Sequence, residues 1–513
     1  MHKDVIVVGA GISGIAAGYN LKKSCPNKSF TILEARDNIG GTWDLFKYPG
    51  IRSDSDMHTL GFRFKPWIHD KSIADGPSIL EYLNETIDEY DLRNHILLNN
   101  KIKSANWNSD QSIWELAIDE NNLNNNILLN HKVISANWNS KDATWELKVL
   151  SNGNEINVKC NFLFLCGGYF SYTKPHMPHF INQDKFRGKV IHPQFWDENL
   201  DYKNKKVAVI GSGATAITIV PEIAKKAKHV VMIQRSPSYV VSRPRVDSIN
   251  KFLSKFLPQK FTYFLIRWKN ILWQSYTFYL ARKFPNRIKD RIIDLLKDEL
   301  GDDYDIEKHF TPSYKPWDQR MCLVPDSDLF LAIKEKKVSV ATDTIKEFQS
   351  DGVMLDSGEK IKAEIIITAT GIELNTLNDI RVMIDDQVIN AHDRLTYKGM
   401  MMSGVPNLAL SFGYVNASWT LRADLTCEYV CRLINLMDKK NVSCCTPIDD
   451  LDAYGDDKLI DFTSGYIKRG LHMMPKQGNK SPWKNYQNYI KDIFSIRYVS
   501  IDDTNLKFHN SKD

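Results

Sequence analysis

The sequence predicts an α/β fold with two Rossmann-like dinucleotide-binding domains, because two glycine-rich loops each lie between a short apolar run and a helical segment. The first loop, residues 9–14 with the pattern G-x-G-x-x-G, follows the apolar run 5–8. The second loop, residues 211–216 with the pattern G-x-G-x-x-A, follows the apolar run 207–210. A chain with two dinucleotides can pass electrons between them, so the pattern indicates a flavoprotein reduced by a nicotinamide.

Length and composition are those of an ordinary globular protein. A chain of 513 residues predicts two or three domains, and 43% hydrophobic with 25% charged residues is typical of water-soluble chains. The net charge of +5 favours no class of partner, and no nucleic-acid-binding module is recognisable. Eight scattered cysteines without a C-x-x-C pair favour reduced thiols, and neither a signal peptide nor a membrane-spanning run is evident. We therefore expect a cytoplasmic protein.

The first loop has the features of a site for FAD. Gly9 permits the tight turn, Gly11 lets the backbone approach a pyrophosphate, and Gly14 allows close packing of helix on strand. The next apolar run, residues 30–33, ends at Glu34, twenty residues after Gly14. A carboxylate there accepts hydrogen bonds from a ribose and repels a 2′-phosphate, which favours FAD or NAD over NADP.

The second loop has the features of a site for NADPH. Ala216 replaces the third glycine, and the following strand, residues 229–233, runs into Gln234, Arg235 and Ser236 rather than a carboxylate. A guanidinium at this place can hold a 2′-phosphate by two parallel hydrogen bonds. The alternative for Arg235 is a solvated residue at the end of a strand.

Residues 186–197 match the pattern F-x-G-x-x-x-H-x-x-x-W-[PD] at every defined position. With this segment the chain resembles the class B flavoprotein monooxygenases of the Baeyer–Villiger type. The ending Trp196-Asp197 distinguishes that type from the flavin-containing monooxygenases proper. In the family, His192 and its neighbours lie on the interdomain linker and couple domain movement to cofactor position.

The resemblance also implies the residues of the active site. In the family the motif G-G-T-W, here residues 40–43, contributes to the flavin site, and the Asp of the next motif, here Asp54, lies beside the isoalloxazine. The family's active-site arginine corresponds to Arg320, which would hold a fixed positive charge and be oriented by Asp54. Many relatives have Lys before this arginine, whereas this chain has Gln319.

The resemblance extends over nearly the whole chain and is closest to the ethionamide-activating monooxygenases of actinobacteria. It implies that NADPH reduces FAD, that oxygen is taken up as a C4a-peroxyflavin, and that one oxygen atom is inserted into a ketone to give an ester. Sulfoxidation of thioethers or thioamides is a side activity consistent with the same site. A flavin-containing N- or S-monooxygenase is the alternative, and a non-catalytic flavoprotein a weaker one. A disulfide reductase would need a redox cysteine pair, which is missing.

The motifs divide the chain into four parts. Residues 1–180 form the first part of the FAD-binding domain, 181–204 the linker with the fingerprint, 205–370 the NADPH-binding domain, and 371–513 the second part of the FAD-binding domain.

Two inserts interrupt these domains. Within a β insert at about 96–150, residues 96–101 and 104–109 recur 31 residues later, which predicts a tandem duplication that lengthens an antiparallel meander by about two strands. A helical insert at about 246–310 contains a stretch crowded with aromatic and cationic residues. Its helices either pack over the active site and partner subunits, or attach to an anionic membrane surface or form a route for an apolar substrate. A homo-oligomer stays open as well.

The sequence thus names a set of candidate residues. The candidate catalytic residues are Arg320 and Asp54. The candidate cofactor-binding residues are Gly9, Gly11, Ser13, Gly14, Glu34, Gly41, Thr42, Trp43, Asp54, Gly211, Gly213, Ala214, Thr215, Ala216, Arg235 and Ser236. No metal site is predicted, and the expected partners are a small ketone or organosulfur substrate and molecular oxygen.

Overall fold

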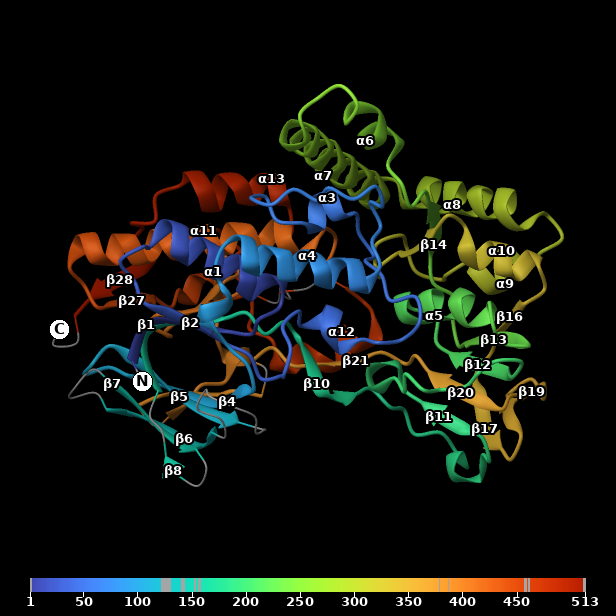
Figure 1. Ribbon diagram of the computed structural model, residues 1–513, viewed down its shortest axis with the longest axis horizontal. Coiled ribbons are helices and arrows are strands. Elements are labelled where there is room, and N and C mark those ends of the chain that lie inside the picture. The colour runs from blue at the N-terminus through green and yellow to red at the C-terminus, as the bar shows by residue number, and fades with distance from the viewer. Residues whose placement is uncertain are drawn as a thin grey trace.

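The computed structural model contains two α/β halves that lie side by side (Figure 1). It describes residues 2–120, 131–139, 144–151, 154–155, 158–377, 379–385, 387–455, 459 and 462–510. The N-terminal and C-terminal segments build one half together, and the middle of the chain builds the other. We call them the first and the second half.

The first half is built on a mixed sheet with the order β23-β22-β4-β5-β9-β1-β2-β3, in which β26 also pairs with β9. Its parallel centre is β26, β9, β1, β2 and β3. Residues 5–8 of β1 and all of β2 are buried and mostly apolar, because both of their faces are covered. The strands are β1 His2–Val8, β2 Phe30–Leu33, β3 Ile96–Leu97, β4 Asn100–Asn108, β5 Ile113–Glu120, β9 Val158–Leu165, β22 Arg381–Ile384, β23 Gln387–Val388 and β26 Leu408–Leu410. The principal helices are α1 Ile12–Ser24, α4 Gly76–Glu89 and α11 Trp419–Lys440.

The second half is built on a five-stranded parallel sheet with the order β11-β20-β12-β13-β16. These strands are β11 Lys189–Ile191, β12 Lys206–Ile210, β13 His229–Gln234, β16 Val338–Thr342 and β20 Ile365–Thr368. Helices α5 Ala214–Ala224 and α10 Asp328–Lys334 pack on this half, and a small antiparallel sheet consists of β17 Ile345–Gln349, β18 Gly352–Leu355 and β19 Lys360–Lys362. The predicted linker 181–204 needs a correction, because β11 within it pairs with β20 and is the edge strand of this sheet.

The chain crosses twice between the halves, and the two crossings pair with each other. Strand β10 (Phe170–Pro175) leads from the first half toward the second, and β21 (Ile372–Leu374) leads back. They form a two-stranded antiparallel ribbon, so the two crossings lie side by side.

The β insert differs from the prediction in two ways. It begins at β4 rather than at 96, because β3 pairs with β2 in the parallel centre. The repeated segment forms a second hairpin, β6 (His131–Asn139) with β7 (Thr144–Ser151), in a separate sheet with β8 (Asn154–Glu155), rather than lengthening the first. The reason is that β4 already lies between β22 and β5, and β5 between β4 and β9, so neither has a free edge.

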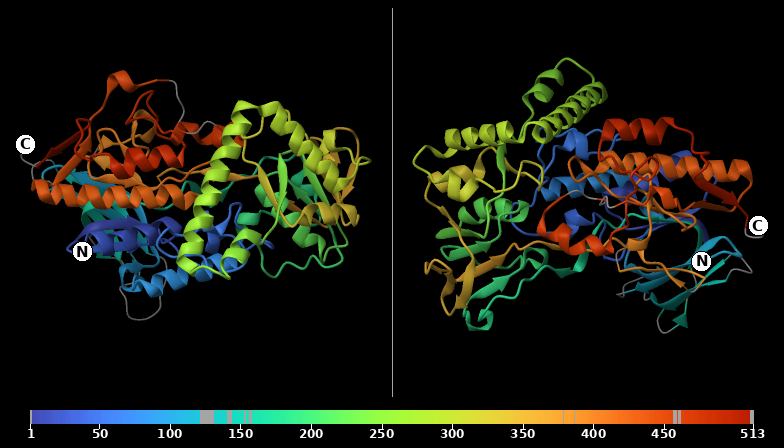
Figure 2. Two further views of the ribbon diagram at one scale, coloured as in Figure 1. Left: turned by 90° about the horizontal axis from the view of Figure 1, so that it is seen from above. Right: turned by 180° about the vertical axis from the view of Figure 1, so that it is seen from behind.

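The helical insert contains α6 Ser248–Leu253, α7 Gln259–Lys283, α8 Pro285–Leu300 and α9 Ile306–Phe310. Helix α8 packs on the second half through Ile292 and Leu296. Helix α7 crosses to the first half, as the view from above shows (Figure 2).

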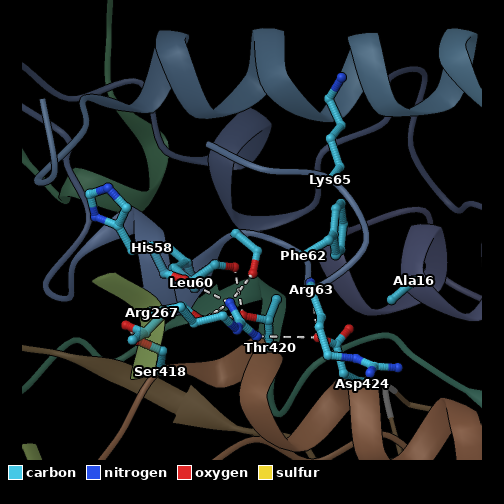
Figure 3. Close-up of polar contacts among 12 residues, drawn as sticks. Ala16, His58, Leu60, Phe62, Arg63, Lys65, Arg267, Ser418, Thr420 and Asp424 are labelled. Carbon is cyan, nitrogen blue, oxygen red and sulfur yellow. Dashed lines mark hydrogen bonds and ion pairs between the residues drawn. The ribbon is translucent and has the colours of Figure 1, made fainter. Parts of the chain in front are cut away.

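Arg267 anchors α7 to the first half (Figure 3). Its guanidinium Nη1 donates to the carbonyl oxygens of His58 at 2.7 Å and Gly61 at 2.8 Å. Its Nη2 lies 3.4 Å from the buried carboxylate of Asp424 on α11. Every partner is buried, so the contact holds a fixed geometry between α7 and the turn that contains α3 (Met57–Leu60).

The remaining elements are short. The helices are α2 Thr42–Leu45, α12 Gly465–Gly470, α13 Tyr489–Asp492, the 3₁₀ turns η1 Arg93–His95, η2 Gln183–Lys185, η3 Pro193–Phe195, η4 Ala391–Asp393, η5 Leu451–Ala453 and η6 Leu471–Met473, and the π turn η7 Ile493–Tyr498. The strands are β14 Val240–Arg243, β15 Cys322–Pro325, β24 Thr396–Tyr397, β25 Met401–Met402, β27 Cys444–Pro447 and β28 Leu506–His509. All eight cysteines lie in the described part as buried free thiols. Within that part, no helix has the length and apolar character needed to cross a bilayer.

Candidate functional site

The first glycine loop forms a tight turn that only glycine can make. Gly9 has φ +97°, and a Cβ built on it would lie 3.0 Å from the Cys166 carbonyl oxygen. A Cβ on Gly14 would lie 1.8 Å from the Gly9 carbonyl oxygen, so α1 could not pack where it does with any other residue there. A Cβ on Gly11 would touch nothing closer than the Gly41 Cα at 3.5 Å, which leaves the backbone accessible from that side.

The N-terminus of α1 is suited to a diphosphate. The helix starts after Gly11, which has no side chain to cap it, and its first turn contains no acidic residue. The backbone N–H groups and the positive end of the helix dipole are therefore available for an anion.

Glu34 stands at the end of β2 and is 4% exposed. One carboxylate oxygen accepts from the Ala10 N–H at 2.7 Å and the other from the Arg36 N–H at 3.0 Å. Burial raises the pKa of this carboxyl, and the backbone hydrogen bonds oppose the rise. Since each oxygen keeps a further lone pair, Glu34 can also accept from the hydroxyls of a ribose.

A cavity of about 640 Å³ draws its walls from both halves. It begins at the first loop and reaches the start of α5 in the second half. The predicted site residues that line it are Gly9, Gly11, Ser13, Glu34, Gly41, Thr42, Trp43, Asp54, Ala214, Thr215 and Arg320. The predicted site residues outside its lining are Gly14, Gly211, Gly213, Ala216, Arg235 and Ser236.

Asp54 and Arg320 meet at the cavity as a two-point ion pair. The Nη2 of Arg320 donates to Asp54 Oδ1 at 3.1 Å, and the Nε lies 3.0 Å from Oδ2. The two side chains are 33% and 40% exposed, so the pair faces the open part of the cavity. Burial opposes the charge of the Arg320 guanidinium, but Asp54 raises its pKa above the ordinary value. The guanidinium is therefore a permanent cation held in one orientation.

The second loop has the same construction as the first. Gly211 has φ +142°, and a Cβ on it would lie 2.3 Å from the Ala369 carbonyl oxygen. Among the described residues, nothing lies within 4 Å of a Cβ built on Gly213, so an open space adjoins the N-terminus of α5. Helix α5 likewise starts after a glycine and has no acidic residue in its first turn. The loop can therefore accept a second diphosphate.

Arg235 and Ser236 follow the last residue of β13 and are both exposed. Neither residue lines the cavity. Their predicted contact with a 2′-phosphate therefore remains a proposal. Nearby, Ser238 donates to Ser212 in the second loop at 3.2 Å, which joins the segment after β13 to that loop.

The fingerprint segment lies beside the two crossings. The Nδ1 of His192 accepts from the Gln194 N–H at 3.1 Å, and Gln194 in turn donates to the Ser171 carbonyl oxygen on β10 at 2.9 Å. Partial burial lowers the pKa of His192 to about 4, so the ring is neutral at physiological pH. His192 therefore joins β11 to the ribbon between the halves.

Several residues of the cavity were missed by sequence reasoning. Trp419 donates from its indole N–H to the Ser13 hydroxyl at 2.7 Å and stacks on Tyr169 with ring centroids 5.3 Å apart. Arg52 forms an ion pair with Asp328 of α10 and so bridges the halves. Arg52 stands two residues before Asp54, so the motif that predicts Asp54 was the available signal for it, whereas no local pattern predicts the contact of Trp419. The missed lining residues include Arg36, Tyr48, Arg52, Tyr169, Tyr172, Thr218 and Trp419.

Comparison with known proteins places this geometry among flavoproteins. A family model described as flavin-binding monooxygenase-like matches residues 112–401, and a model described as an NAD(P)-binding Rossmann-like domain matches residues 7–70. EthA, an FAD-containing monooxygenase of Mycobacterium tuberculosis, is 45% identical over 511 residues, which are 99% of this chain and 98% of EthA. AlmA of Acinetobacter baylyi, a probable FAD-binding monooxygenase, is 42% identical over 514 residues, covering 100% of this chain and 97% of AlmA.

The fold also matches solved structures. A steroid monooxygenase bound to NADP superimposes with a TM-score of 0.73 at 19% identity, over 99% of this chain and 100% of that one. This likeness shows a shared fold of both halves.

Proposed function

We propose that this chain, which belongs to the flavin-binding monooxygenase-like family, converts ketones to esters with NADPH and molecular oxygen. Membership in the family follows because the family model covers more than half of the chain and relatives align along its whole length. Oxidation of thioethers or thioamides at sulfur is part of this proposal. The expected substrate is a small ketone or organosulfur compound.

Family membership confirms the coarser predictions from the sequence. The chain is an α/β enzyme of the flavin monooxygenase class, its cofactor classes are a flavin and a nicotinamide dinucleotide, and the resemblance to the ethionamide-activating subgroup agrees with the 45% identity to EthA. The assignment of each cofactor to a loop belongs to the proposal.

We assign FAD to the first loop and NADPH to the second. Glu34 favours a ribose without a 2′-phosphate at the first loop, while Arg235 offers a cation for a 2′-phosphate at the second. The residues of each loop fit a diphosphate, since both helices begin with uncapped N–H groups beside open space. With both cofactors bound, NADPH would reduce FAD, and the reduced FAD would supply the activation of oxygen.

The observation that carries the proposal is the Asp54–Arg320 pair on the wall of the cavity that contains the first loop. Formation of an ester from a ketone passes through a negatively charged oxygen, and a preorganised cation stabilises that charge. Arginine suits the task because it stays protonated beside a basic oxygen, and Asp54 fixes its orientation. Gln319 in place of the lysine of many relatives leaves Arg320 as the cation that the segment presents.

The experiment is a product analysis of the purified, FAD-loaded protein. It receives NADPH, isotope-labelled oxygen gas, and a panel of linear, cyclic and aryl ketones and thioethers, and the products are identified by mass. Esters with one labelled oxygen are expected. Sulfoxides without esters would favour the alternative, a flavin-containing N- or S-monooxygenase. Absence of any NADPH oxidation would contradict the proposal.

A further inference from the structure

The outer face of α7 carries a row of large apolar side chains that the described part of the protein leaves uncovered. At about 100° per residue, most of their positions fall on the half of α7 that faces away from buried Tyr263, Arg267 and Ile271. The row is Phe261, Phe264, Leu272, Trp273, Tyr276 and Tyr279, each at least 50% exposed. Phe252 on the adjoining α6 is 60% exposed, and Phe256 in the turn after α6 is 72% exposed. A contiguous exposed patch of this kind marks an interaction site rather than ordinary surface.

The inner face of α7 is fixed, so the row cannot turn inward. Arg267 binds the His58–Gly61 turn and Asp424 (Figure 3). Asn270 and Gln274 donate to the Asp56 carboxylate, each at 2.8 Å. Helices α6 and α7 lie at the periphery of the molecule (Figure 1), and the exposed fractions of the row show that it faces solvent.

The charge of this segment has one sign. Residues 248–289 contain nine lysines and arginines and no aspartate or glutamate. Three of the nine form ion pairs within the protein: Arg267 as described, Lys269 with Asp247 at 2.6 Å, and Arg282 with Asp318 at 2.9 Å. The other cations lie on α6, in the turn after it or toward the ends of the aromatic row, and are Lys251, Lys255, Lys260, Lys283, Arg287 and Lys289.

We propose that α6 and α7 attach this protein to the surface of a membrane rich in anionic lipids. Tryptophan, tyrosine and phenylalanine are favoured at the level of lipid headgroups, and lysines and arginines around them bind the anionic phosphates. The aromatic row enters the headgroup region, and the cations at its ends face the lipid phosphates.

A second copy of the chain fits this face less well. In a symmetric dimer the same patch of both copies meets, and here two cationic segments without a single acidic residue would be brought together. Anionic lipid headgroups provide the opposite charge along the whole segment.

The test is flotation of the purified, FAD-loaded protein with lipid vesicles. Vesicles of phosphatidylcholine alone are compared with vesicles that contain about one third phosphatidylglycerol, each at about 0.05 M and about 0.5 M salt. The protein is expected to float with the anionic vesicles at low salt, and much less with neutral vesicles or at high salt, because salt screens the attraction.

Two triple variants separate the aromatic and the cationic contributions. Phe256→Ser with Phe264→Ser and Trp273→Ser, or Lys251→Glu with Lys255→Glu and Lys260→Glu, should each lower the bound fraction by about tenfold or more. The matched control replaces equally exposed residues of the first half by serine, and it should float like the parent. The control residues are Leu451, Phe494 and Tyr498, exposed by 81%, 62% and 69%. An unchanged rate of NADPH oxidation shows that each variant is folded.

The proposal is wrong if the parent does not float with anionic vesicles, or if the aromatic variant floats as well as the parent. It is also wrong if light scattering finds a parent dimer that the aromatic variant dissociates while no flotation occurs, because a second copy then covers the patch.

Discussion

Asp54 and Arg320 reach each other from loops of the two halves, and each uses two atoms to do so. Arg320→Lys keeps a positive charge but loses the two-point contact, and an ammonium gives up its proton more readily than a guanidinium. We expect the rate of ester formation to fall by about 100-fold while the bound flavin content stays unchanged. Product mass and flavin absorbance measure the two quantities. The control is Arg287→Lys on α8, and parent-like ester formation by the Arg320 variant would contradict the assigned role.

Arg235 is the residue on which the choice of NADPH depends. Arg235→Ala removes the cation proposed for the 2′-phosphate. Because this loses a hydrogen bond to a charged group, we expect the KM for NADPH to rise by about 10- to 100-fold. The KM for NADH should change little, because that coenzyme has no 2′-phosphate. Steady-state kinetics with both coenzymes provide the measurement, with exposed Arg291→Ala as control. An unchanged ratio of the two KM values would leave Arg235 as a solvated strand-end residue.

At the scale of elements, α7 depends on one buried arginine. Arg267→Gln leaves the Asp424 carboxylate without its counter-ion and the carbonyls of His58 and Gly61 with weaker donors. Removal of one partner from a buried pair typically costs about 3–5 kcal/mol. Urea denaturation should show this loss, whereas Lys260→Gln, at an exposed site on the same helix, should change stability little. Equal stability of the two variants would mean that α7 is held by other contacts.

The same pair gives stability a dependence on pH. Burial raises the pKa of Asp424 to about 6, and Arg267 opposes the rise. A folded-state pKa above the unfolded one means that this group favours folding below pH 3.8 and that its contribution is lost as pH rises through about 6. In Arg267→Gln the pKa of Asp424 should rise further, so the variant should be less destabilised at pH 5 than at pH 8. An equal loss at both pH values would contradict the ionic basis of the contact.

Individual elements differ in how far the sequence predicts them. The run 30–33 coincides with β2, because a short apolar run followed by an acidic residue is typical of a Rossmann strand. The sequence alone places β3 in the insert and β11 in the linker, because strands of two or three residues carry too little periodicity to be recognised. Their place depends on pairing with β2 and β20, which are distant in the sequence.

The residues of the site divide in the same way. Gly9, Gly14 and Glu34 could be predicted because their roles are local to one strand–loop–helix unit. The contact of Trp419 with Ser13 joins residues 406 positions apart, and no local pattern specifies such a pair. The ion pair of Arg52 with Asp328 is likewise a product of how the two halves pack.

At the scale of the whole molecule, the cavity exists because the halves meet. Asp54 comes from the first half, whereas Thr215 and Arg320 come from the second. The ribbon of β10 and β21 connects the halves, and His192 lies beside it as a neutral ring. A rotation of one half on the other would thus change the distance between the two glycine loops and the position of the Asp54–Arg320 pair together.

The duplicated hairpin has one copy within the main sheet and one that packs against that copy as a separate sheet. The first copy is part of the main sheet, where β4 pairs with β22 and β5 with β9, and its Trp114 is fully buried. The second copy repeats the same register, including an irregularity between Val133 and Ser135 that matches the one between Ile102 and Ser104, but it forms its own sheet.

Deletion of residues 117–147 should therefore be tolerated. It joins Leu116 of the first copy to Lys148 of the second at the same place in the repeat, so one complete hairpin and the native entry to β9 remain. Additions of this kind at loop positions cost little, and we expect flavin content and the rate of NADPH oxidation to stay within about twofold of the parent. Trp114→Ala is the contrasting variant, because it empties a core position and should cost about 3–5 kcal/mol of stability. An insoluble or flavin-free deletion variant would show that the second copy supports the first half, and the duplication would then have become part of the fold.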